Sequence, residues 1–408
     1  MLGCADGSFA LRNSESTTAA RPVVLLATNH LYGWTGSETL LLTLTEWLRT
    51  HGCELTVYAR RLDRVWASRQ IGEGVYVTDD LDTLRAHSFD LAHVQHNSCL
   101  MDVRAAFPSL PIVFASLGVL PFLEQPAPFD CGIYRFLAIS EEVLANLVAC
   151  GVPAERIEIV RNLVSEQRFA PTEPIRSRPE RILVLSYKIG EARKLMLQAA
   201  AHIVGASIRF IGGARETLAQ DQLAVAINAA DIVVSLGRGV VESMLCGRVP
   251  LVFDVHGGDG LVTPANMDEL RTCNFSGRCH RWDYTIDDLV VEIGKYRPEY
   301  GMQLRERALA QFGLVANQPR VLAVYAAAAE AIPLPNADRQ SITAFCSALA
   351  REDLLFSLHQ QLAINALTAE IGRIKATFSW QITKPLRLLA FLWRKLISAI
   401  SSFRTNQL

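Results

Sequence analysis

The chain has 408 residues, of which 50% are hydrophobic and 20% are charged, so it can fill the cores of two or three globular domains. Its net charge of -1 gives no general attraction for nucleic acid, so we expect no nucleic-acid partner. Nine cysteines lie scattered, mostly in apolar runs, which favours reduced thiols in a cytoplasmic protein over a disulfide framework. The first 20 residues are polar and mixed in charge, which indicates a disordered tail and no secretion signal.

The first half of the chain alternates strand-like and helix-like segments. Residues 22–28 form an apolar run typical of a buried strand, and residues 39–49 carry leucines at helical spacing until Gly52 ends the helix. A glycine-bearing loop, 29–38, joins them, and the order strand, loop, helix, strand favours a parallel α/β sheet. Further strands are predicted at 54–58, 74–78, 90–94, 112–115 and 134–139.

Two histidines lie near the end of the strand predicted at 90–94. His93 is within that strand and His96 follows it, a position that suits acid–base or hydrogen-bonding chemistry near neutral pH. A hydrogen-bonded core histidine explains His93 equally well, whereas the position of His96 favours function.

The second half begins after a segment rich in proline and charge, 172–181, which is typical of a linker. Three cations, Lys188, Arg193 and Lys194, follow its first predicted strand, 182–186. Fixed cations stabilise the charge that develops on a departing diphosphate. A solvated helix start is the simpler alternative.

The most informative stretch runs from Asp231 to Pro264. A strand at 232–235 leads into the tight turn 237–239, a helix at 240–246 and a second strand at 250–254, after which Gly257 and Gly258 form a predicted loop. Two loops thus leave strand ends at one sheet edge, where open α/β sheets bind ligands and a helix N-terminus favours an anion. Glu242, in the first helical turn, can accept hydrogen bonds from ligand hydroxyls.

This stretch resembles the donor-binding signature of GT-B glycosyltransferases, in particular the retaining family 4 type found in bacterial cell-surface polysaccharide synthesis. The segment 136–171 resembles the same family's connection between its domains, and Gly36-Ser37-Glu38 resembles its acceptor-side loop. The resemblance implies two Rossmann-like domains that face a cleft, an acceptor domain at 21–171 and a nucleotide-sugar domain at 182–333.

The resemblance also implies roles for individual residues. Glu242 would hold the ribose of the donor, and His93, His96 and Glu242 form the predicted catalytic set. The predicted donor-binding residues are Lys188, Lys194, Arg238, Gly239, Glu242, Gly257 and Gly258.

Two positions depart from the family pattern. Its first glutamate is replaced by Val234, and the place of its His-Gly pair reads Ser116-Leu117-Gly118.

The remaining segment, 334–408, is predicted to be a helical basic tail. Leucines and isoleucines recur at helical spacing across 341–374, and the segment 379–387 resembles one found in polysaccharide glycosyltransferases. Residues 376–408 combine basic and aromatic residues without acids, which favours the surface of an anionic membrane. A helix that covers the protein's own surface or a partner is the alternative.

The sequence therefore predicts a cytoplasmic glycosyltransferase whose tail contacts the inner face of the membrane, with a nucleotide sugar as donor and a glycan or lipid-linked acceptor. The resemblance implies retention of configuration and neither metal nor other cofactor. Two alternatives stay open: a nucleotide-sugar isomerase of the same fold, and a non-catalytic relative that serves as a binding or scaffold protein. The latter gains weight from the two departures.

Overall fold

The computed structural model describes residues 22–212, 218–255, 257–331 and 339–377. The tail predicted to be disordered, 1–20, and nearly all of the predicted membrane segment, 376–408, lie outside these residues. The chain divides into two units, Met1–Ser341 and Ile342–Leu408, each considered by itself. The predicted boundaries at 171, 181 and 333 stay a prediction.

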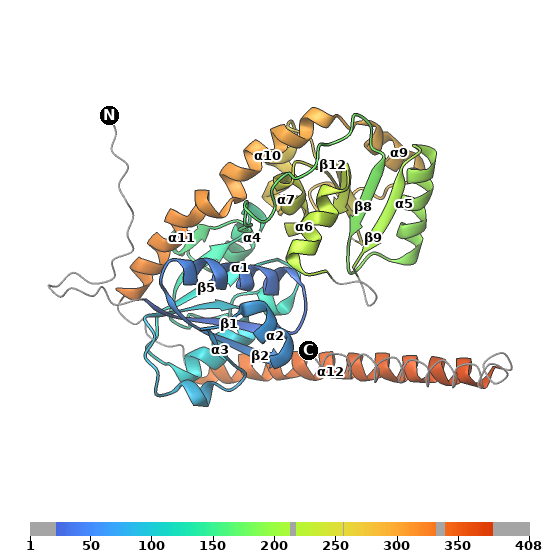
Figure 1. The fold of residues 1–408 in the computed structure, drawn as a ribbon. Coiled ribbons are helices and arrows are strands. Elements are labelled where there is room, and N and C mark those ends of the chain that lie inside the picture. Colours follow the sequence, from blue (N-terminus) through green and yellow to red (C-terminus); the bar gives the residue numbers. More distant parts are fainter. Residues whose placement is uncertain (1–21, 213–217, 256, 332–338, 378–408) are drawn as a thin grey trace, which may run out of the picture. The chain divides into compact units, whose positions relative to one another are not determined.

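The first half folds into a parallel sheet with strand order β3-β2-β1-β4-β5-β6-β7 (Figure 1). Its strands are β1 (Val23–Leu31), β2 (Glu54–Leu62), β3 (Tyr76–Thr78), β4 (Leu91–Gln95), β5 (Ile112–Ser116), β6 (Ile133–Ala138) and β7 (Ile157–Ile159). All neighbouring strands in it pair in parallel. The predicted strands are therefore confirmed. The apolar runs form strands such as β1 and β5 because these are buried on both faces of the sheet.

Helices connect these strands and cover the sheet. They are α1 (Gly36–Thr50), α2 (Arg64–Ile71), α3 (Asn97–Ala106) and α4 (Glu141–Ala149), with short 3-10 turns η1 (Leu81–Leu84), η2 (Phe122–Glu124) and η3 (Ala154–Arg156). The leucine face of α1 packs into the core of the sheet, as its spacing predicts. The sequence analysis missed α2 and α3, which are short and rich in polar residues.

The second half forms another sheet with strand order β12-β11-β10-β8-β9. Its strands are β8 (Arg181–Leu185), β9 (Ser207–Ile211), β10 (Ile232–Ser235), β11 (Val249–Asp254) and β12 (Gly257–Leu261). Its helices are α5 (Glu191–Ile203), α6 (Gln220–Asn228), α7 (Arg238–Leu245), α8 (Met267–Leu270), α9 (Ile286–Gly294) and α10 (Pro298–Phe312), with a 3-10 turn η4 (Arg271–Cys273). One apolar cluster joins the sheet to α5 and α9, and another joins it to α6, α7 and α10, so helices cover both faces.

Helix α11 (Leu314–Ala329) follows the second sheet in sequence but packs on the first. Its residues Val321, Tyr325 and Ala328 are buried in the first core, against strands β4, β5 and β6. The chain therefore returns to its first half, and this return helps to hold the two sheets in one unit.

The C-terminal unit is described as far as Thr377 and consists of helix α12 (Arg339–Ala376), as the leucine spacing predicts. Leu358, Leu362 and Leu367 on it are exposed. None of the helices in the described residues is both long enough and apolar enough to cross a membrane.

Two local predictions around the second sheet are wrong. Helix α7 begins at Arg238, so Arg238 and Gly239 belong to its first turn and only Gly237, with φ of 54°, forms the sharp turn. Gly257 and Gly258 do not form a loop but begin β12, which pairs antiparallel with β11. The paired glycines suggested a loop. Glycine is instead needed at these two positions because other parts of the chain pack closely against their backbone.

The Gly258→Ala substitution tests this packing. A Cβ at Gly258 would lie 2.6 Å from the Val252 carbonyl oxygen and 2.7 Å from the Tyr284 ring, and both neighbours are buried. We expect a loss of about 1–3 kcal/mol in the free energy of unfolding, measured by urea denaturation. Gly294→Ala is the matched control, because a Cβ there meets nothing within 4 Å and lies in a helix. Equal stability of the two variants would contradict the packing argument.

Candidate functional site

Each sheet has one place where the strand order reverses. In the first sheet it lies between β1 and β4, and in the second between β8 and β10. In open parallel α/β sheets, the crevice at the carboxyl ends of such a strand pair is the usual ligand site. The loops that leave these four strands carry most of the residues predicted from the sequence, so these two crevices define the candidate site.

His96 lies at the reversal of the first sheet, directly after β4, in a strained backbone conformation. Its φ is 76°, which an L residue rarely adopts, and its side chain is buried. The backbone N–H of Asn29 donates a 3.2 Å hydrogen bond to Nδ1, so the neutral ring carries its proton on Nε2. Burial and, to a smaller extent, the nearby His30 lower its pKa to about 3. His96 is thus a fixed, neutral hydrogen-bonding group near neutral pH.

His30, at the end of β1, is the neighbour of His96 across the crevice. The centroids of the two rings lie 5.6 Å apart. Burial lowers the pKa of His30, while the negative charge of Glu38 opposes that effect. The sequence analysis missed His30, although its place at the end of the first strand is the same signal that singled out His96.

Glu38 organises the loop that precedes α1. Its carboxylate accepts backbone hydrogen bonds from Tyr32 (2.7 Å), Gly33 (2.9 Å) and Thr35 (3.0 Å), and its side chain is fully buried. A carboxylate three residues into a helix stabilises such N–H groups and the helix start. The predicted acceptor-side loop therefore exists, with Glu38 as the group that fixes its shape.

Gly36 and Ser37 complete the predicted acceptor-side loop and begin α1. Gly36 is exposed, and a Cβ added there would meet nothing within 4 Å; the Ser37 hydroxyl lies 3.3 Å from that of Thr35. These two residues remain accessible to a ligand, whereas Glu38 does not.

Lys188 lies at the reversal of the second sheet, in the turn after β8. The Ser186 hydroxyl oxygen accepts hydrogen bonds from the N–H groups of Lys188 (3.1 Å) and Ile189 (3.0 Å) and donates one to Asp254 (2.7 Å). This turn leaves the Lys188 side chain exposed, with no carboxylate of the described chain within 4 Å of its ammonium. Lys188 is accordingly a cation available to an anionic ligand.

The other two cations of this segment have protein partners. Arg193 donates a 2.8 Å hydrogen bond to the Asp254 carbonyl and stacks over Phe253. Lys194 lies 3.6 Å from Glu191 on the same helix. The structure therefore distinguishes Lys188 from Lys194, the two residues predicted for the donor site, and from Arg193, which competed with them.

Glu242 and Arg238 form a buried ion pair on the first turns of α7. Arg238 Nε donates a 2.8 Å hydrogen bond to Glu242 Oε1, and the two side chains are 8% and 5% exposed. Arg238 also donates to the Leu163 carbonyl (2.6 Å) and to the Thr43 hydroxyl of α1 (3.0 Å). Burial raises the pKa of Glu242, while the charge of Arg238 opposes that effect. The pair links the second sheet to the first.

The loops of the two crevices lie within electrostatic range of each other. Burial raises the pKa of Tyr187, beside Lys188, and the negative charges of Glu242 and Glu38 raise it further. Arg168 adds ion pairs to Glu46 of α1 (3.1 Å) and to Asp221 of α6 (2.9 Å). Residues predicted for the acceptor and donor sides are thus brought together.

The predicted glycines have structural neighbours rather than open space. A Cβ at Gly239 would lie 2.2 Å from the Ser235 hydroxyl, so glycine lets α7 approach β10. A Cβ at Gly257 would lie 2.7 Å from the Trp282 carbonyl oxygen. Packing explains all three donor-side glycines, including Gly258, and any contact they make with a ligand stays a prediction.

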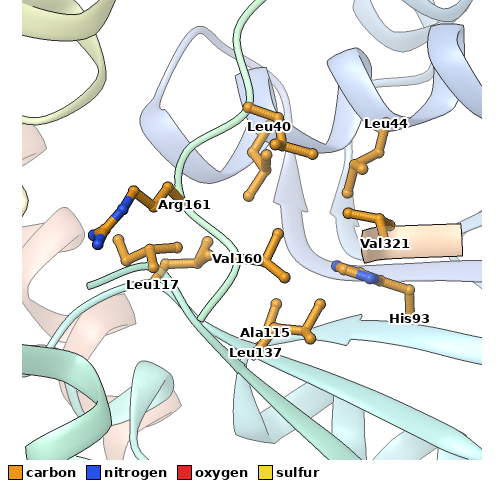
Figure 2. A pocket seen from close by; sticks show the side chains of 11 residues that line it. Leu40, Leu44, His93, Ala115, Leu117, Leu137, Val160, Arg161 and Val321 are labelled. Carbon is orange, nitrogen blue, oxygen red and sulfur yellow. The ribbon is translucent and has the colours of Figure 1, made fainter. Parts of the chain in front are cut away.

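His93 lies apart from these loops, in the core of the first sheet. Tyr325 approaches its Nδ1 to 2.6 Å, and burial lowers the pKa of His93 to about 4. The ring lines an apolar cavity of about 20 Å³, which fits one water molecule but no sugar. Figure 2 shows the other lining side chains, with the guanidinium of Arg161 turned away from them. These contacts match a core histidine, and a catalytic role for His93 stays an untested prediction.

Known proteins resemble this chain in structure but not in sequence. No family model and no curated protein matches the sequence. A glycosyltransferase from Rickettsia africae has a TM-score of 0.52 at 11% identity, covering 76% of this chain and 99% of that one. HepE from Anabaena, solved in complex with UDP and glucose, has a TM-score of 0.50 at 14% identity, covering 74% of this chain and 99% of that one. Identities this low show the fold alone, and the predicted GT-B fold with two Rossmann-like sheets is confirmed.

The Arg238→Ala substitution tests the buried ion pair. Removal of the guanidinium leaves the Glu242 carboxylate buried without its partner, so we expect the free energy of unfolding to fall by about 3–5 kcal/mol in urea denaturation. Arg85→Ala removes a control pair with Asp82 whose side chains are 61% and 74% exposed, and we expect a change below about 1 kcal/mol. In the Arg238→Ala background, the Glu242→Ala substitution should lower the free energy of unfolding by less than it does in the wild type. A loss for Arg238→Ala no larger than for Arg85→Ala would refute the role of the pair.

Proposed function

We propose that this protein is a glycosyltransferase that moves a sugar from a nucleotide-sugar donor to a glycan or lipid-linked acceptor. The observation that carries the proposal is that the two crevices, each at a strand reversal, lie within electrostatic range of each other. Lys188 is available in one, and Glu38 from the loop of the other acts on the neighbouring Tyr187. The fold shared with the Rickettsia glycosyltransferase and with HepE supports the same reaction class.

In the proposed reaction, the second sheet binds the donor. The exposed ammonium of Lys188 contacts the diphosphate and stabilises the negative charge that grows on it as the bond to the sugar breaks. Glu242, held by Arg238, accepts a hydrogen bond from a ribose hydroxyl through its remaining lone pairs. His96 offers a neutral Nε2–H group to a hydroxyl of the sugar or acceptor.

Several finer features belong to the proposal and derive from the family resemblance. These are retention of configuration at the transferred sugar, independence of metal, a role in cell-surface polysaccharide synthesis, and a cytoplasmic place at the membrane surface. NMR analysis of the anomer in the product tests retention, and liposome binding with and without residues 376–408 tests the membrane contact.

Nucleotide binding is the direct test of the donor site. Among UDP, GDP, dTDP and their sugars, we expect one series to raise the melting temperature by several degrees, since ligand at a hundredfold excess over its Kd adds about 2.7 kcal/mol. Lys188→Ala should weaken that binding roughly 10- to 100-fold, because it removes a charged contact with the diphosphate. The side chain is exposed, so the variant should fold normally.

Arg64→Ala is the matched control, because Arg64 is also an exposed cation but pairs with Asp79 at the surface of the first sheet. Its nucleotide-induced shift should equal that of the wild type. The absence of a shift with all three nucleotide series would refute the donor site. Binding without transfer or hydrolysis of the sugar would instead favour the scaffold alternative.

A further inference from the structure

Helix α4, in the first half of the chain, begins with two adjacent acids that bind arginines of the second half. Arg278 meets the carboxylate of Glu142 through two nitrogens, with Nη2–Oε2 at 2.6 Å and Nε–Oε1 at 3.0 Å. Arg271 donates a 3.2 Å hydrogen bond to Glu141. The side chains of Glu142 and Arg278 are only 23% and 14% exposed, so solvent and salt screen this two-point ion pair less than they screen a surface pair.

Both arginines belong to one segment of the second half, residues 271–281, which we call the clamped segment. Of the four non-glycine residues with positive φ in the described chain, three lie in this segment: Asn274 (53°), Phe275 (50°) and Arg281 (59°). L residues rarely adopt this conformation, and it persists only where the surrounding structure enforces it. The two ion pairs with α4 are contacts of that kind.

Other contacts hold the clamped segment from both halves of the chain. The side chain of Asn162, in the connection between the two sheets, donates a 3.0 Å hydrogen bond to the side chain of Asn274. The buried carboxylate of Asp259, in β12, accepts hydrogen bonds from the N–H groups of Cys279 (3.4 Å) and His280 (2.8 Å). The first half therefore holds one side of the segment, and the second sheet holds the other.

The clamped segment also packs on the turn that precedes α7. The N–H of Gly237 donates a 3.0 Å hydrogen bond to the carbonyl of Phe275. A Cβ at Gly237 would lie 3.6 Å from the side-chain nitrogen of Asn274, so the two backbones are in close contact. Helix α7, which carries Glu242, thus starts from a turn that the clamped segment supports.

We propose that Glu142 is a positioning residue for donor binding. Through Arg278 it keeps the clamped segment in its strained conformation, and the segment keeps the start of α7, with Glu242, in the geometry that binds a nucleotide sugar. This inference rests on the proposed function. Glu142 itself does not touch the ligand, and the donor site of the second half comes to depend on a helix of the first half.

Loss of the ion pair acts on affinity through the population of the binding geometry. Without the pair, the clamped segment relaxes toward a more common backbone conformation, and the carbonyl of Phe275 leaves the N–H of Gly237. The apparent affinity then falls by the fraction of molecules in which the turn keeps its geometry. A fraction of about one tenth gives a loss of about tenfold.

Isothermal titration calorimetry of the full chain with UDP, GDP and dTDP measures this effect. Glu142→Gln removes the charge but keeps the shape, and we expect it to weaken binding of the nucleotide roughly tenfold. Arg278→Gln should do the same, and the double variant should be no weaker than either single variant, because both remove one interaction. Asp130→Asn is the matched control, since Asp130 pairs with Arg156 at 2.8 Å within the first half, and its affinity should stay within about twofold of the wild type.

Hydrogen exchange of the unliganded proteins gives a second readout that needs no nucleotide. In Glu142→Gln we expect faster amide exchange across residues 236–245, where the turn and α7 lie, than in the wild type or in Asp130→Asn. Exchange in β1 should be the same in all three proteins, because its hydrogen bonds do not involve the clamped segment.

The possible failures are distinguishable. If Glu142→Gln binds the nucleotide as tightly as the wild type, or if exchange across 236–245 is unchanged, the positioning role is overturned and the proposed function stands. A loss of affinity of the same size in Asp130→Asn would also overturn it, because the effect would then reflect general stability. If UDP, GDP and dTDP all fail to bind the wild type, the proposed function is overturned and this inference with it.

Discussion

The buried ion pair of Arg238 and Glu242 is the interaction on which the arrangement of the two sheets most depends. Two charges removed from water are costly unless their donors and acceptors are satisfied. Arg238 meets that condition with Glu242, the Leu163 carbonyl and the Thr43 hydroxyl of α1. The Leu163 and Thr43 partners belong to the first half of the chain, whereas Arg238 and Glu242 belong to the second. A shift of one half against the other would therefore break two hydrogen bonds of a buried guanidinium. Helix α11 reinforces this arrangement by packing on the first core.

The candidate site shows how local context separates residues of the same type. Lys188, Arg193 and Lys194 lie within seven residues, yet Ser186 and Asp254 shape a turn that leaves Lys188 exposed while Arg193 is bound to Asp254. Similarly, His93 and His96 lie three residues apart. One is enclosed by Tyr325 and apolar side chains, and the other lies at the strand reversal with a strained backbone. Exposure and partners, rather than residue identity, decide which of them can meet a ligand.

Acidic groups in this site differ in the same way. The Glu38 carboxylate accepts hydrogen bonds from three backbone N–H groups, and the Glu242 carboxylate accepts one from Arg238. Glu124 is half-buried and has no such donor among the described residues; burial raises its pKa, while the positive charges of Lys188 and Arg278 oppose that effect. The three carboxylates thus differ in how many protein groups bind them.

The sequence by itself determined the alternation of strands and helices, since apolar runs and leucine spacing report burial directly, as in β1, β10 and α1. It also placed Lys188 and His96 after strand ends and Glu242 in the helix that follows a strand. It could not determine that Arg238 would also bind the Leu163 carbonyl and the Thr43 hydroxyl, or that Gly257 and Gly258 would pair in β12. Arg238 and Thr43 are far apart in sequence, and no local pattern encodes such a contact. Only the tertiary structure, by bringing the carboxyl ends of two sheets together, decided which charges meet and which stay available.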